Sequence, residues 1–140
     1  MYSNILVPVD LEESSSWEKA VPTALALSRC FGANVGLVYV VPDATLASQA
    51  QWSGLALRRI VETARARLCH LAAELRAGDE MQSHVTTGRV FRGILDVAEQ
   101  EKADLIVLAS HRPDLRDLLI GENAERIVRH ARCSVLVVRS

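Results

Sequence analysis

Short apolar segments that lack helical periodicity constrain the fold of this chain more than any other feature. Four of them are rich in β-branched residues: Ile5–Val9, Val35–Val41, Leu105–Ala109 and Val135–Val138. Such segments are typical of strands that are buried on both faces, as in parallel sheets. A fifth segment, Met81–Thr87, alternates more between apolar and polar residues, as expected of an edge strand. The pattern predicts a five-stranded parallel sheet.

Stretches with helical periodicity lie between these segments. The first begins near Ser15-Ser16-Trp17-Glu18, which fits a capping box, and is predicted to end at Phe31 before Gly32. The second carries an apolar stripe from Leu57 to Leu75 that includes Val61, Ala64, Leu68 and Leu71. The last two are predicted to bury Val90, Ile94, Leu95, Val97 and Ala98, and then Ile120, Ala124, Ile127, Val128 and Ala131.

Strands that alternate with helices indicate an α/β fold with a doubly wound sheet and helices on both faces. Parallel strands need long connections, and packing makes those connections right-handed. We therefore predict the strand order 3-2-1-4-5, with the first strand at the centre and the reversal between the first and fourth strands. No repeat or charged linker divides the chain, so residues 1–140 are expected to form one domain.

The charge balance and the cysteines exclude several classes of protein. A formal net charge of -1, from 16 basic and 17 acidic residues, gives no reason to expect nucleic acid as a partner. The apolar runs are far shorter than the roughly 20 residues that span a bilayer, and no signal peptide is recognisable, so we expect a cytoplasmic protein without membrane insertion. Cys30, Cys69 and Cys133 are too widely spaced for a zinc motif and are expected to be reduced and at least half-buried.

The predicted topology locates the candidate ligand site. In an open α/β sheet, ligands bind beyond the carboxyl ends of the strands, where the strand order reverses. This rule selects Asp10, the loop after Val40 and the loop that starts at Ser110. The Asp10 carboxylate could hold a ribose hydroxyl or a Mg²⁺ ion, or it could simply form a turn.

A second candidate is the predicted start of the last helix, at Gly121-Glu122-Asn123. Helix N-termini present free amides and a positive dipole end to anions, and Gly121 would let a phosphate approach closely. An ordinary helix cap is the alternative. His111 follows a buried strand, but neither it nor His70, His84 or His130 belongs to a recognisable catalytic arrangement.

Several sequence segments together resemble the universal stress protein family, and especially its small bacterial F and G branch. They are Ile5-Leu6-Val7-Pro8-Val9-Asp10, Ala109-Ser110-His111-Arg112-Pro113-Asp114, Leu119-Ile120-Gly121-Glu122-Asn123-Ala124, Val128-Arg129-His130-Ala131 and Cys133-Ser134-Val135-Leu136-Val137-Val138-Arg139. The resemblance extends over the full length of the chain.

Nucleotide-binding members of that family carry Gly-x-x-Gly, nine residues, and then Gly-Ser or Gly-Thr. Here Ala109 and Arg112 stand at the two glycines, eight residues separate Arg112 from Gly121, and Glu122 replaces the hydroxyl residue. The Arg112 guanidinium suits phosphate oxygens, whereas the Glu122 carboxylate would repel them. Glu122→Ser is accordingly expected to raise ATP affinity about 5- to 30-fold.

The resemblance implies an adenine-nucleotide site for ATP or AMP, with Mg²⁺ at Asp10. Pro8, Val9 and Val40 would line the adenine pocket, Asp10 would serve ribose or metal, and the phosphates would face Ala109, Ser110, His111, Arg112, Gly121, Glu122 and Asn123. The expected function is that of a nucleotide-responsive regulator or binding module in the stress response.

Two other functions stay open. One is a nucleotide-free interaction protein with a degraded phosphate loop, and the other is a weak ATPase or self-phosphorylating protein. A homodimer is expected through the last strand, Val135–Arg139, because an apolar edge strand is a template for pairing. Val137→Lys is expected to dissociate it.

Overall fold

A computed structural model of the chain describes residues 1–43, 54–76, 80–110 and 122–139. Its five strands form one all-parallel sheet in the order β3-β2-β1-β4-β5, as predicted. The strands are β1 (Asn4–Pro8), β2 (Asn34–Pro42), β3 (Met81–Gly88), β4 (Leu105–Ser110) and β5 (Ser134–Arg139). The order reverses between β1 and β4, which places the expected ligand site at their carboxyl ends.

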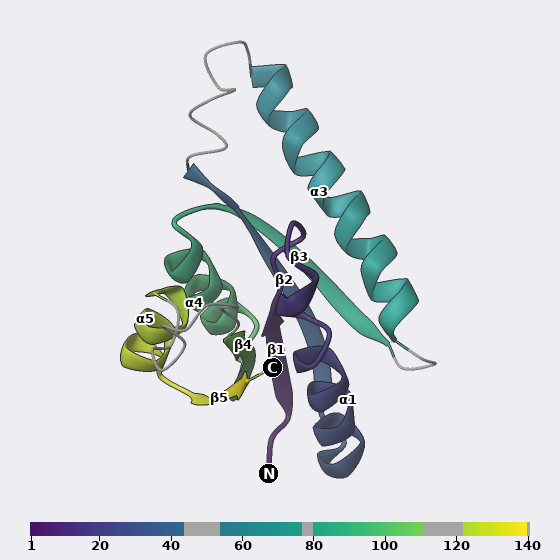
Figure 1. The fold of residues 1–140 in the computed structure, drawn as a ribbon, viewed down its shortest axis with the longest axis vertical. Coiled ribbons are helices and arrows are strands. Elements are labelled where there is room, and N and C mark those ends of the chain that lie inside the picture. Colours follow the sequence, from purple (N-terminus) through teal and green to yellow (C-terminus); the bar gives the residue numbers. More distant parts are fainter. Residues whose placement is uncertain (44–53, 77–79, 111–121, 140) are drawn as a thin grey trace.

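Helices cover both faces of the sheet (Figure 1). One face packs against α1 (Ala20–Phe31) and α3 (Gly54–Leu75), and the other packs against α4 (Val90–Gln100) and α5 (Glu122–His130). Successive strand residues point to opposite faces, so Leu37 lies in the core beneath α1 and α3 while Val38 lies in the core beneath α4. Both side chains are fully buried.

Glycine brings α4 close to the sheet. A Cβ atom at Gly93 would lie 2.8 Å from Cγ2 of Val40 and 3.0 Å from Cγ2 of Thr86. Any larger side chain at this position would push α4 away from β2 and β3. Gly93 therefore sets the position of the α4 turn that stands above Val40.

The predicted start of the first helix is wrong. Ser14–Ser16 form a short 3₁₀ helix, η1, and α1 begins at Ala20 rather than Ser15, without a side-chain cap. Pro22 explains the difference. In a helix from Ser15, Pro22 would occupy the interior and remove a hydrogen bond, whereas in α1 it lies in the first turn, where its missing amide costs nothing. The predicted end is correct, because Gly32 adopts φ 67° after Phe31.

Several burial predictions also differ from the structure. Val128 is 47% exposed and Leu57 is 37% exposed, although Ala124, Ile127, Ala64 and Leu68 are buried as predicted. Val90 and Leu95 are only partly buried against the α4 core, and Ala131 is likewise partly buried. These residues flank the apolar stripes, whose edges meet solvent rather than the sheet.

The cysteines are more exposed than predicted. Cys30 and Cys69 are exposed and free, because they lie on the outer sides of α1 and α3, and Cys133 is half-buried and free. β5 is also less buried than a strand covered on both faces, since it forms the edge of the sheet. Within the ranges that the structure describes, every helix is too short or too polar to span a bilayer.

Candidate functional site

A cavity of about 200 Å³ opens at the carboxyl ends of β1, β2 and β4. It lies at the point where the strand order reverses, between β1 and β4, which is where ligands bind in open α/β sheets. The first turns of α4 and α5 close its far side. Its lining residues are Pro8, Val9, Asp10, Ser16, Val38, Tyr39, Val40, Pro42, Val90, Ile94, Leu108, Ala109, Asn123, Ala124 and Ile127.

The walls of this cavity are largely apolar. Val40, Ile94, Leu108 and Ile127 are all buried and contribute aliphatic surface from four different elements. Four of the lining residues carry polar side chains: Asp10, Ser16, Tyr39 and Asn123. An apolar cavity with a few polar groups is typical of a site for a small organic ligand.

A compact turn holds Asp10 at the end of β1. The Ser16 hydroxyl accepts a hydrogen bond from the Asp10 amide at 2.8 Å and donates one to the Glu13 carbonyl at 2.8 Å. One carboxylate oxygen of Asp10, Oδ1, accepts the Glu12 amide at 3.0 Å, as in an Asx turn. The turn fixes the side chain, and no hydrogen bond or ion pair from the residues that the structure describes occupies Oδ2, which is therefore available to an outside partner.

The start of α5 contributes Asn123 and Ala124 to the cavity, but not Glu122. The Glu122 carboxylate lies 2.6 Å from the guanidinium of Arg126, and its side chain is 69% exposed. This i,i+4 pair directs the acid along the helix surface rather than into the cavity. The helix start thus presents its amides with the nearby acid partly neutralised.

Tyr39 lies between this cavity and a second one on the other side of β2. Burial raises the pKa of its hydroxyl above the usual value, and the negative charges of Asp10 and then Glu12 raise it further, while Arg67 lowers it. The hydroxyl is therefore a neutral donor at physiological pH.

The structure brings six of the residues that the sequence selected into one cavity: Pro8, Val9, Asp10, Val40, Ala109 and Asn123. Ser110 ends β4 but is not among the residues that line the cavity, and Glu122 turns toward Arg126. His111, Arg112 and Gly121 lie outside the described residues.

Other lining residues escaped the sequence analysis. Val38 shares a face of β2 with Val40, so strand periodicity alone could have found it. Ser16 was assigned to a capping box and was therefore not considered for the site. Val90 and Ile94 were predicted only as core residues, because nothing in the sequence shows that the first turn of α4 reaches the end of β2.

The described residues do not form a metal site made of protein ligands alone. Among those residues, no three side chains of His, Cys, Asp or Glu gather to form a cage. The Asp10 carboxylate is a hard oxygen ligand of the kind that Mg²⁺ accepts when phosphates and water complete its shell. The chemistry of the site therefore fits Mg²⁺ only as the companion of a phosphorylated ligand.

Comparisons with known proteins agree on the family. The model of the universal stress protein family matches residues 1–139. Universal stress protein G of Shigella flexneri is 32% identical over 144 residues, which cover 99% of this chain and 100% of that protein.

Two solved structures share the fold. The hypothetical protein MJ0577 superposes with a TM-score of 0.82 at 25% identity, covering 100% of this chain and 97% of the other. A universal stress protein from Archaeoglobus fulgidus, solved in complex with dAMP, has a TM-score of 0.67 at 21% identity, with 97% of each chain covered. The family match over almost the whole sequence, together with the sheet order, shows that this chain belongs to the universal stress protein family.

Proposed function

We propose that the chain binds an adenine nucleotide, ATP or AMP, in the cavity at the ends of β1, β2 and β4, and acts as a regulator or binding module in the stress response. The observation that carries the proposal is the cavity itself, with its apolar walls and the Asp10 carboxylate at its edge. The A. fulgidus relative, solved with dAMP, supports the ligand class.

The size of the cavity indicates how the ligand is placed. Its volume of about 200 Å³ is below the roughly 300 to 1,000 Å³ of pockets that enclose a whole drug-sized ligand. The cavity would therefore enclose the base, against Val40 and Ile94, and leave the ribose and phosphates at the surface. The ribose would lie near Asp10.

The start of α5 would receive the phosphates. Helix N-termini favour anions through their free amides and their dipole, and Asn123 and Ala124 bring this end of α5 to the cavity. Ala109, at the end of β4, leaves room beside them. Asp10 would contribute one ligand to a Mg²⁺ ion bound with ATP, while the phosphates and water supply the others.

Equilibrium binding of ATP and AMP to purified, nucleotide-stripped protein tests this proposal. Asp10→Asn keeps the acceptor of the turn but removes the charge, so it is expected to abolish the gain in ATP affinity that Mg²⁺ gives, with a smaller effect on AMP. Asp96→Asn, at an exposed position on α4, is the matched control.

Two outcomes would contradict the proposal. If the wild-type protein binds neither nucleotide, the chain acts as a nucleotide-free interaction protein. If Asp10→Asn and Asp96→Asn change the Mg²⁺ dependence equally, Asp10 is only a turn residue.

A homodimer is part of the proposal. β5 forms one edge of the sheet, and Leu136 on it is 38% exposed. An apolar edge strand is suited to pairing with a second copy of the same strand.

A further inference from the structure

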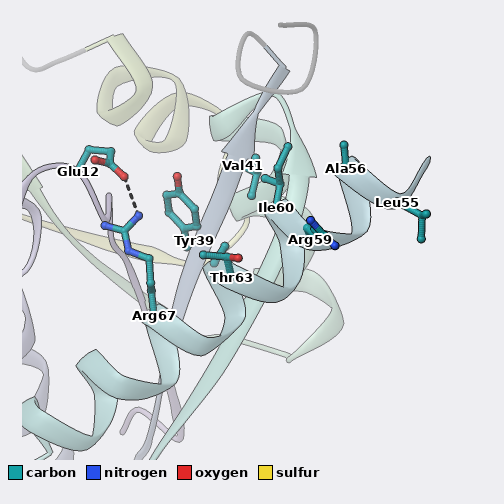
Figure 2. A pocket seen from close by; sticks show the side chains of 10 residues that line it. Glu12, Tyr39, Val41, Leu55, Ala56, Arg59, Ile60, Thr63 and Arg67 are labelled. Carbon is teal, nitrogen blue, oxygen red and sulfur yellow. Dashed lines mark hydrogen bonds and ion pairs between the residues drawn. The ribbon is translucent and has the colours of Figure 1, made fainter. Parts of the chain in front are cut away.

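A second cavity, of about 640 Å³, lies between β2 and the first turns of α3 (Figure 2). It is on the face of β2 opposite Val38 and Val40, because Tyr39 and Val41 line it. Its volume is within the range of sites that hold small organic ligands. The cavity at the ends of β1, β2 and β4 is called the adenine cavity below, after its proposed ligand. Among the described residues, Tyr39 alone lines both cavities.

The sequence of α3 is unusual where it lines this cavity. Ala56, Arg59, Ile60, Thr63 and Arg67 recur at helical spacing and form one face of the helix toward β2. Further along α3, the face that covers the sheet carries only apolar side chains at its buried positions, such as Leu68 and Leu71. In the part of α3 that lines the cavity, Arg59, Thr63 and Arg67 are instead interleaved with apolar residues.

One of these polar residues has a structural explanation. Arg67 Nη1 donates to Glu12 Oε1 at 2.8 Å, and Nη2 donates to the Leu11 carbonyl at 3.2 Å. Arg67 thereby ties α3 to the turn after β1. Its charge is matched by that of Glu12.

Arg59 and Thr63 have no such explanation. Neither forms an ion pair or side-chain hydrogen bond within the part of the chain that the structure describes. Once Arg67 is paired with Glu12, Arg59 carries the remaining charge of the cavity lining. The cavity therefore has a net charge of about +1 and complements one negative charge on a ligand.

The rest of the cavity lining is mostly apolar and suits a ligand whose uncharged part is apolar. Val41 is 1% exposed at the floor, Ala64 is 6% exposed, and Ile60 is half-buried beside them. At the rim, Leu55 is 70% exposed and lines the same cavity. These side chains offer apolar surface, while the hydroxyls of Tyr39 and Thr63 offer hydrogen bonds next to it.

We propose that this cavity is a second ligand site, for a small organic monoanion with an apolar body, such as an aromatic carboxylate. The carboxylate pairs with Arg59 through the two-pronged geometry that guanidinium groups favour. Thr63 and Tyr39 donate hydrogen bonds, and the apolar body lies on Val41 and Ile60. This site is separate from the adenine cavity and does not depend on nucleotide binding.

Titration with 2-naphthoate, followed through backbone amide shifts in the NMR spectrum, tests the proposal. We expect saturable shifts in the first turns of α3 and at Tyr39 to Val41, and weaker binding of the neutral 2-naphthamide. Arg59→Gln removes a charge-assisted hydrogen bond and is expected to lower the affinity about tenfold. Thr63→Val is expected to lower it less, because a neutral hydrogen bond contributes less.

Arg58→Gln is the matched control. Arg58 is exposed, precedes Arg59 on the same turn and does not line the cavity. This variant should bind 2-naphthoate as the wild type does, and saturating AMP should not displace the ligand.

Three outcomes would overturn the proposal. The first is an absence of shifts at millimolar 2-naphthoate, and the second is equal loss of affinity in the Arg58 and Arg59 variants. The third is a map of shifts centred on Asp10, Ala109 and Asn123, which would place the ligand in the adenine cavity instead.

Discussion

The carboxylate of Glu122 lies 2.6 Å from the guanidinium of Arg126, one turn further along α5. The sequence alone suggested that this acid faces the phosphates and weakens nucleotide binding strongly. The ion pair and the 69% exposure of the Glu122 side chain reduce that effect, because an exposed, paired charge interacts weakly with a neighbour. Glu122 therefore departs from the family motif, but we do not expect its paired, exposed carboxylate to prevent nucleotide binding.

We expect Glu122→Ser to raise the affinity for ATP by only about two- to fivefold, rather than by the larger factor that the sequence suggested. The gain should be larger for ATP than for AMP, which has fewer charges. Isothermal titration calorimetry measures both. Glu125→Ser is the control, because Glu125 forms a similar pair with Arg129 at 3.0 Å but lies nearly one turn further from the start of α5. An equal gain in this control would mean that the phosphates do not lie near Glu122.

Gly93→Ala tests the close contact between α4 and β2. The new methyl group would meet Cγ2 of Val40 at 2.8 Å, so α4 must shift. We expect the free energy of unfolding in urea to fall by about 1 to 3 kcal/mol. Nucleotide affinity should fall as well, since Val40 and Ile94 line the adenine cavity. Gly54→Ala, where the added atom meets nothing within 4 Å, should change stability by less than about 0.5 kcal/mol.

The edge strand β5 offers a test of the dimer. Val137 packs against the core beneath α4 and α5, so Val137→Lys would also destabilise the monomer. Leu136, which is 38% exposed, is the better position. We expect Leu136→Lys to convert a dimer into a folded monomer in analytical ultracentrifugation, whereas Val128→Lys on the exposed side of α5 should not. A wild-type protein that sediments as a monomer at micromolar concentration would contradict the proposed interface.

The raised pKa of Tyr39 predicts a pH dependence. Burial is its main cause, and the charge of Asp10 contributes more than that of Glu12. The contribution of the neutral Tyr39 hydroxyl to the free energy of unfolding is present in full below the pKa of about 10 that tyrosine has in the unfolded chain. It is lost as the pH rises through the higher pKa of Tyr39 in the folded protein. In an ultraviolet absorbance titration, Tyr39→Phe should remove the late-titrating component. Asp10→Asn should lower the midpoint of the Tyr39 titration more than Glu12→Gln does. A larger effect of Glu12→Gln would contradict the stronger influence of Asp10 on the Tyr39 hydroxyl.

Periodicity was sufficient to predict the sheet, because buried parallel strands and amphipathic helices each have a characteristic spacing. The strand order then followed from connection rules, and it placed Asp10 and Ala109 at one edge. Contacts that depend on packing could not be predicted in this way. The approach of α4 to Val40, the Ser16 hydroxyl at Asp10 and the turn of Glu122 toward Arg126 each join groups whose geometry no local pattern specifies.

The start of α1 illustrates a different limit. A capping-box pattern and a proline compete within eight residues, and the proline determines the start because its ring cannot occupy the interior of a helix. Similarly, the basic stretch formed by Arg58-Arg59 and Arg65 to Arg67 is typical of the solvated side of a helix. Only the position of α3 against β2 shows that Arg59 and Arg67 line a cavity, together with Thr63.

Equilibrium binding of AMP to nucleotide-stripped Ala109→Leu protein tests the adenine cavity most directly. Ala109 lines the cavity at the end of β4, and a leucine there would fill part of its volume of about 200 Å³ without changing any charge. We predict that the wild type binds one AMP per chain, that Ala109→Leu loses this binding while remaining folded by circular dichroism, and that Ala26→Leu on the exposed side of α1 retains it. Undiminished AMP binding by folded Ala109→Leu protein would show that the nucleotide binds elsewhere and would contradict the proposed site.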